Sequence, residues 1–135
     1  MLLKPAVVGA ALTCAFFAIA FLQSGFDKVA DRRGNLEWLM GHFAKSPLKG
    51  SVPALLLVVT LMELASGLLS LIAVGWIAAG QGYDVAVWAI SLSLATLLML
   101  FFGQRVAKDY AGAAVIAAYV VVGLGGLALL AMIRA

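Results

Sequence analysis

The chain has 135 residues, of which 65% are hydrophobic and only 11% are charged, and its formal net charge is +3. With a mean hydropathy of +1.13, its composition lies well outside the range of soluble globular domains. This composition predicts an integral membrane protein whose partner is the lipid bilayer, and it leaves no basis for nucleic-acid binding.

Four apolar runs are long enough to cross a bilayer, which takes about 20 residues. They cover residues 5–26, 52–76, 85–102 and 111–133. Because lipid offers the backbone no hydrogen-bond partners, runs of this length form helices. We therefore predict an all-α integral membrane fold, an antiparallel bundle of four transmembrane helices, in a single membrane domain over residues 1–135.

The first run ends in polar residues. Gln23 and Ser24 come just before its end, and Lys28 comes just after it. The same run contains Cys14, which is the only cysteine of the chain. A membrane thiol oxidoreductase that works through its own dithiol is therefore excluded.

A short helical pattern follows in the connection between the first two runs, residues 27–51. Asn35 is a suitable N-cap, and apolar residues recur at helical spacing at Leu36, Leu39, Met40 and Phe43. The pattern predicts a short amphipathic helix over residues 35–45, which either lies in the headgroup region of the membrane or caps the mouth of the bundle. We expect His42, the sole histidine, to be solvated rather than a ligand.

Glu63, near the middle of the second run, requires a physical reason, because a carboxylate at the bilayer midplane costs about 2.5–3.5 kcal/mol. Helical spacing places Glu63 on one polar and small face together with Thr60, Ser66, Gly67 and Ser70. This face must look into the bundle. Glu63 is therefore the candidate catalytic or proton-handling residue, and a purely structural carboxyl group is the alternative.

The connection between the third and fourth runs, residues 103–110, returns to the membrane surface that Lys28 occupies. We expect a polar funnel above Glu63, although its basic side chains would also suit anchors at lipid headgroups. The candidate ligand, quinone or proton site comprises Glu63, Gln23, Ser24, Lys28, Ser66, Gly67, Arg105, Lys108 and Asp109. No residues have the spacing of metal ligands, so no metal site is predicted.

Basic residues are distributed unevenly between the two sides of the predicted bundle. The connections over residues 27–51 and 103–110 hold Lys28, Arg32, Arg33, Lys45, Lys49, Arg105 and Lys108, whereas the other side has only Lys4 and Arg134. By the positive-inside rule, the two connections should be cytoplasmic and both termini periplasmic, in a bacterial cytoplasmic (inner) membrane.

The segments FLQSGFDKV, MELASGLLSLI and GQRVAKDYAGAA resemble, in this order, motifs of the DoxX family of small four-span membrane proteins. The resemblance covers most of the chain. It points to Ser24, Gly25, Lys28, Glu63 and Gly67, and further to Lys108, Asp109 and Gly112. Some members of that family are associated with membrane subunits of thiosulfate:quinone oxidoreductase. The resemblance thus implies a quinone-facing subunit, with quinone as the candidate ligand and no redox cofactor motif of its own.

We consider three functions. The first is an accessory or quinone-facing component of a larger membrane redox or respiratory complex, which is not catalytic alone. The expected protein partners are other membrane subunits, with a homo-oligomer as the alternative. The second is an enzyme subunit of the thiosulfate:quinone oxidoreductase type. The third is a small proton-coupled four-span transporter, in which Glu63 would alternate between protons and a cationic substrate. Transporters of that kind carry their carboxylate in the first helix, unlike this chain.

Overall fold

The computed structural model describes residues 4–134, so residues 1–3 and 135 of the predicted single domain lie outside the described residues. Its helices are α1 (Pro5–Ala30), α2 (Arg32–His42), the short 3-10 helix η1 (Lys49–Ser51), α3 (Val52–Ala78), α4 (Asp84–Val106) and α5 (Tyr110–Arg134). Four of them, α1, α3, α4 and α5, are long and apolar enough to cross a membrane. The predicted all-helical bundle with four apolar spans is confirmed, and each span extends somewhat beyond its predicted bounds.

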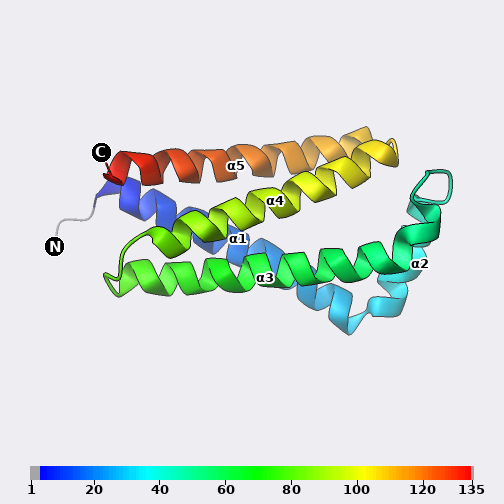
Figure 1. Cartoon of the computed structure of the whole chain (residues 1–135), viewed down its shortest axis with the longest axis horizontal. Coiled ribbons are helices and arrows are strands. Elements are labelled where there is room, and N and C mark those ends of the chain that lie inside the picture. Colours follow the sequence, from blue (N-terminus) through cyan, green and yellow to red (C-terminus); the bar gives the residue numbers. More distant parts are fainter. Residues whose placement is uncertain (1–3, 135) are drawn as a thin grey trace.

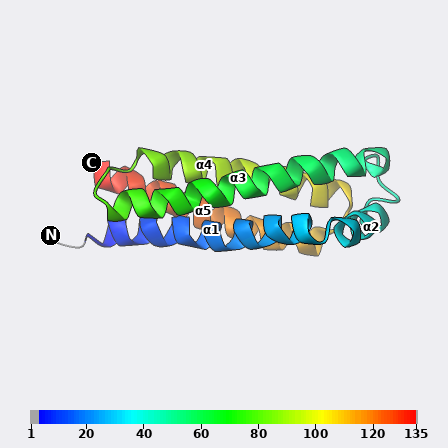
Figure 2. The same cartoon turned by 90° about the horizontal axis from the view of Figure 1, so that it is seen from below.

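The four long helices run antiparallel along one elongated bundle (Figure 1). The described N-terminal and C-terminal ends lie together at one end of the bundle, and α2 lies at the other. Seen from below, α1 and α3 run side by side although another helix separates them in sequence (Figure 2). This pair makes the most extensive helix contact in the bundle.

Glycine allows α1 and α3 to approach closely. A Cβ atom on Gly67 would lie 2.8 Å from the backbone nitrogen of Leu22, and one on Gly25 would lie 2.7 Å from Cδ2 of Leu64. Both distances are shorter than real Cβ contacts, so neither position has room for a side chain. The close approach brings the C-terminal end of α1, where Lys28 lies, against the middle of α3.

Glycine also forms the turn between α3 and α4. Gly80 and Gly82 have φ angles of +73° and +104°, a left-handed region that other residues rarely adopt. The turn is tight, so α3 and α4 form an antiparallel hairpin. At the opposite end of the bundle, Lys108 has a φ angle of +61° in the connection between α4 and α5.

The start of α2 differs from the prediction. The helix begins at Arg32, because the side chain of Asp31 caps it by accepting a hydrogen bond of 3.2 Å from the backbone N–H of Gly34. Asn35, predicted to be the cap, lies one turn inside the helix, and its Nδ2 donates to the carbonyl of Asp31 at 2.8 Å. The helix ends at His42, earlier than predicted. The prediction that Asn35 caps this helix is therefore wrong.

Candidate functional site

The polar face predicted for the second span is buried as a whole. Thr60, Glu63, Ser66, Gly67 and Ser70 are all buried on α3. The hydroxyl of Ser66 lies 2.8 Å from that of Thr96, and the hydroxyl of Ser70 lies 3.4 Å from that of Ser93. These two contacts join α3 to α4, so Ser66 serves helix packing here and does not face a cavity.

Glu63 is paired with Lys28. The Lys28 Nζ lies 2.9 Å from Oε1 of Glu63, whose side chain is only 2% exposed, while that of Lys28 is 17% exposed. The same Nζ donates a hydrogen bond of 2.8 Å to the hydroxyl of Ser24, one helical turn earlier on α1. A buried charge is costly unless it is paired, and Lys28 supplies the pairing charge for Glu63.

The contact between Nζ and Oε1 is close but not aligned as a hydrogen bond. Oε1 of Glu63 is fully buried and has no hydrogen-bond partner among the described residues, although the charge of Lys28 lies 2.9 Å away. The two charges still attract each other at this separation, because Coulomb attraction depends on distance alone, whereas a hydrogen bond also requires alignment. Oε1 therefore keeps an unused acceptor position.

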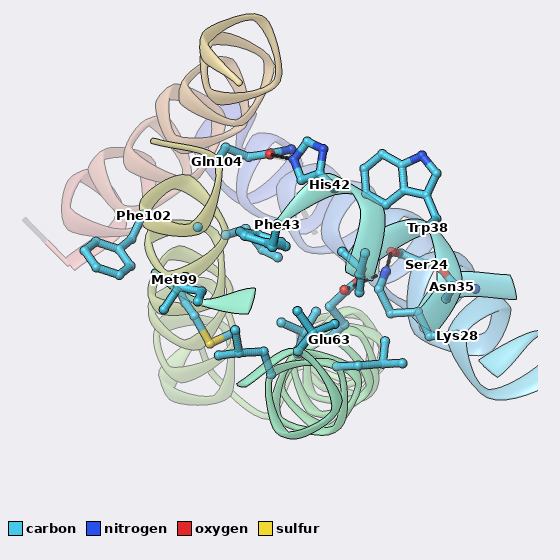
Figure 3. Close-up of a pocket in the computed structure, with 18 of the residues that line it drawn as sticks. Ser24, Lys28, Asn35, Trp38, His42, Phe43, Glu63, Met99, Phe102 and Gln104 are labelled. Atoms are coloured by element: carbon cyan, nitrogen blue, oxygen red, sulfur yellow. Dashed lines mark hydrogen bonds and ion pairs between the residues drawn. The ribbon is translucent and has the colours of Figure 1, made fainter. Parts of the chain in front are cut away.

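A cavity of about 350 Å³, here called the main cavity, opens beside this ion pair (Figure 3). Its polar lining residues are Ser24, Lys28, Asn35, His42, Glu63 and Gln104. The rest of its wall is apolar apart from Gly103 and comes from Trp38, Leu39, Phe43, Leu48, Val52, Leu55, Leu56, Val59, Met99, Leu100, Phe102 and Ile116. An apolar wall with a few polar groups is typical of sites for small organic ligands.

The helix α2 forms one wall of the main cavity through Asn35, Trp38, Leu39, His42 and the C-cap residue Phe43. This arrangement corresponds to the predicted cap over the bundle mouth. Of the apolar residues at helical spacing, Leu39 and Phe43 line the cavity, whereas Met40 is 52% exposed and does not. Trp38 lines it while remaining 61% exposed, so it stands at the rim.

His42 fastens the end of α2 to the opposite side of the bundle. Its Nε2 lies 2.7 Å from Oε1 of Gln104 on α4, and 3.7 Å from Oδ2 of Asp109. Its ring stacks on that of Trp38, with 4.5 Å between centroids. With a side chain only 16% exposed, His42 is not the solvated residue that we expected, because Gln104 and Trp38 occupy its surroundings.

Several predicted site residues do not reach the main cavity. Gln23 is exposed, because it lies about 100° around the helix from Ser24. Arg105 is exposed and places its guanidinium 4.6 Å from the ring centre of Tyr110, and Lys108 is exposed as well. The expected funnel of basic side chains above Glu63 is therefore limited to Lys28.

Asp109 and Gly67 have structural contacts. Asp109 precedes α5, and its Oδ1 accepts a hydrogen bond of 2.9 Å from the N–H of Gly112, as an N-cap does. A Cβ on Gly112 would lie 2.8 Å from the Asp109 carboxylate, so the glycine gives this cap room. Gly67 acts through the close approach of α1 and α3.

A second, smaller cavity of about 100 Å³, here called the side cavity, adjoins the main one. Ser24, Glu63, Leu100 and Ile116 line both cavities, and the side cavity is completed by Phe17, Ala20, Phe21, Leu97 and Tyr119. Ser24 and Glu63 thus lie between the two cavities. Nothing in the sequence pattern indicated the side cavity.

Sequence reasoning missed Asn35 and Gln104 as cavity residues and misplaced His42. The signal that could have found Asn35 and His42 was the predicted cap over the bundle mouth, because a helix in that place turns one of its faces toward the bundle interior. Among residues 4–134, no three His, Cys, Asp or Glu side chains are grouped to hold a metal ion.

No known family model, curated protein or solved structure matches the chain. The resemblance to the DoxX family stays a prediction that rests on the quoted motifs.

Proposed function

We propose that the chain is a DoxX-like subunit of a bacterial inner-membrane redox complex, and that its main cavity holds the ring of a quinone-type molecule. The observation that carries this proposal is the buried Lys28–Glu63 pair beside an otherwise mostly apolar cavity of about 350 Å³. A volume of this size lies within the range of small-ligand sites, roughly 300–1,000 Å³.

Lys28 is the group best placed to bind a quinone carbonyl. An ammonium group has three N–H donors. One is directed to Ser24, and the charge is held by Glu63, so a further donor is left for a ligand oxygen.

A second polar pair, His42 with Gln104, lies elsewhere on the cavity wall (Figure 3). A quinone carries two carbonyl groups on opposite sides of a flat apolar ring. The separate placement of two polar pairs around an apolar space supports a ligand of that type. The mostly apolar wall supports a ligand drawn from the bilayer rather than from water.

Reduction of a quinone consumes two electrons and two protons. The chain carries no redox cofactor motif, so the proposal assigns the electrons to a partner subunit. In this arrangement Lys28 donates a hydrogen bond to a ring oxygen and orients the ring, and Glu63 holds Lys28 in place. The proposal assigns the two protons, like the two electrons, to groups outside this chain. This gives the chain an accessory role, and a thiosulfate:quinone oxidoreductase is one assembly that would use it.

The transporter hypothesis has less support. It requires a carboxylate whose charge is free for a cationic substrate, whereas Glu63 already faces the fixed cation of Lys28 at 2.9 Å.

The proposal also includes the predicted topology, with α2 as an amphipathic helix at the cytoplasmic interface and both termini periplasmic.

Equilibrium binding of a soluble quinone analogue to the protein in nanodiscs tests the proposal. Lys28→Met and Glu63→Gln should each weaken binding about 10-fold or more, since hydrogen bonds to charged groups contribute about 1.5–3 kcal/mol. The matched controls Lys45→Met and Glu37→Gln replace exposed side chains and should bind within twofold of wild type. Absence of binding by the wild type, or equal losses in the controls, would refute the proposal.

The assembly is tested separately. Gentle solubilisation of native membranes should recover the chain together with subunits of a redox complex, identified by mass spectrometry. Recovery only as a homo-oligomer would leave the binding site intact but remove the accessory role.

A further inference from the structure

With a volume of about 100 Å³, the side cavity is too small and too apolar to hold a second polar ligand, yet it shares Ser24 and Glu63 with the wall of the main cavity. Its walls beyond the shared residues are aromatic or aliphatic, apart from the phenol of Tyr119. Phe17 and Phe21 are 0% and 4% exposed, whereas Tyr119 is 38% exposed. The side cavity therefore leads from the buried centre of the bundle to an outer rim at Tyr119.

The packing of α1 against α5 explains this opening. Toward the end with the termini, glycines hold the two helices together: Cβ atoms on Gly126 and Gly123 would lie 2.6 Å from Thr13 and 3.2 Å from Phe17. Figure 1 shows α1 and α5 diverging from there toward α2. The side cavity lies where they diverge, between Ala20 of α1 and Tyr119 of α5, with Leu97 and Leu100 of α4 behind them.

We propose that the side cavity receives the first part of the ligand's hydrocarbon chain, which leaves the bundle between α1 and α5 past Tyr119 into the lipid. This inference rests on the proposed quinone site and specifies its ligand as one with an alkyl or isoprenoid chain next to the ring. An engineered apolar cavity of about 150 Å³ holds benzene, so about 100 Å³ is enough for a short stretch of chain.

Filling the side cavity separates chain binding from ring binding. Ala20→Phe places an aromatic ring in it, while Ala118→Phe on the exposed surface of α5 is the matched control. Two probes are compared in nanodiscs: a substituted benzoquinone without a chain and the same ring with a decyl chain. Ala20→Phe should weaken binding of the decyl compound about tenfold, because the ring excludes about two methylene groups that the wild type buries in the side cavity. Its affinity for the chainless ring should stay within twofold, and Ala118→Phe should change neither.

A photoreactive probe makes the test independent of whether Ala20→Phe folds. A benzoquinone with a diazirine on the second carbon of its chain should label wild-type peptides containing Ala20, Phe21 or Tyr119, and excess unmodified quinone should prevent the labelling. Labelling confined to main-cavity residues such as Leu39 and Val59, or labelling that quinone does not compete, would overturn the inference.

The two proposals fail differently. If the wild type binds neither probe, the quinone site itself is refuted. If it binds both probes and Ala20→Phe binds the decyl compound as well as wild type does, only the chain route is refuted.

Discussion

Replacing the two members of the Lys28–Glu63 pair, singly and together, tests whether this contact stabilises the bundle. The variants are Lys28→Met, Glu63→Met and the double variant. Methionine keeps much of the length of both side chains and removes their charge, so the packing volume changes little. The pair joins α1 to α3, so its loss should be visible in the global stability.

The separation of 2.9 Å sets the magnitude. At an effective dielectric constant of 20, two unit charges at this distance attract by about 6 kcal/mol, and the desolvation of each ion offsets several kcal/mol of this. Removing Lys28 leaves Glu63, which is 2% exposed, without the charge that faces it, so we expect a cost of about 3–5 kcal/mol. Removing Glu63 should cost less, about 1–2 kcal/mol, because the long Lys28 side chain can extend toward the mouth of the cavity.

The double variant should recover most of this loss and unfold within about 1 kcal/mol of wild type, because replacing a buried pair by apolar groups is often neutral. The coupling energy of the cycle should therefore reach at least about 2 kcal/mol. Equilibrium unfolding by titration of mixed micelles with SDS, followed by near-ultraviolet circular dichroism, measures all four proteins.

Arg33 and Glu37 provide the control cycle. They form an exposed pair on α2 at 3.6 Å, with side chains 93% and 72% exposed. Solvent screens such a pair, so Arg33→Met and Glu37→Met should show no measurable coupling. Strictly additive losses at Lys28 and Glu63, indistinguishable from the Arg33–Glu37 cycle, would refute the reasoning that burial makes this ion pair matter.

Three further predictions concern packing, α2 and topology. Gly67→Ala should destabilise the bundle by about 1–3 kcal/mol in the SDS titration, since its new Cβ would clash with the backbone of Leu22. The control Gly75→Ala, whose Cβ would have nothing within 4 Å, should be neutral or stabilising. Equal losses of stability in the two variants would contradict this prediction. His42→Ala should raise amide exchange in α2 about 2- to 10-fold, because one hydrogen bond of about 0.5–1.5 kcal/mol is lost; unchanged exchange would show that His42 does not hold α2. In a cysteine-free background, an impermeant maleimide should label Gln81→Cys in spheroplasts and Glu37→Cys only after lysis, and the reverse pattern would invert the predicted topology.

The long helices and the burial of Glu63 could be predicted from the sequence, because both follow from transfer free energies. An apolar run of more than 20 residues has one low-energy form in lipid, and a polar face on it must turn inward. Ser24, Lys28 and Glu63 were expected near one another on this basis, and the structure brings them together.

The position of residues around the helices was harder to predict at the ends of spans. Gln23 and Ser24 are adjacent in sequence, yet only Ser24 faces the cavity, and the choice depends on the rotation of α1 that Gly25 and Gly67 fix against α3. Hydropathy carries no information about that rotation.

The wall formed by α2 also depends on tertiary contacts. The pairing of His42 with Gln104 joins residues 62 positions apart, and it could not be predicted from either residue type alone. Arg105 and Lys108 were expected at the site because basic residues occur both at membrane surfaces and in binding sites. Composition alone does not distinguish these two roles.

The contact between α1 and α3 has a consequence for biogenesis. The two helices that pack most extensively are separated in sequence by α2 and its loop, so Lys28 emerges from the ribosome well before Glu63. During insertion Lys28 can stay at the membrane interface until α3 is made. Glu63 must enter the bilayer, where it then pairs with Lys28. The order of synthesis therefore places α1 in the membrane before α3 packs against it. A chain truncated after α1 and α2 would leave exposed the surface of α1 that contacts α3.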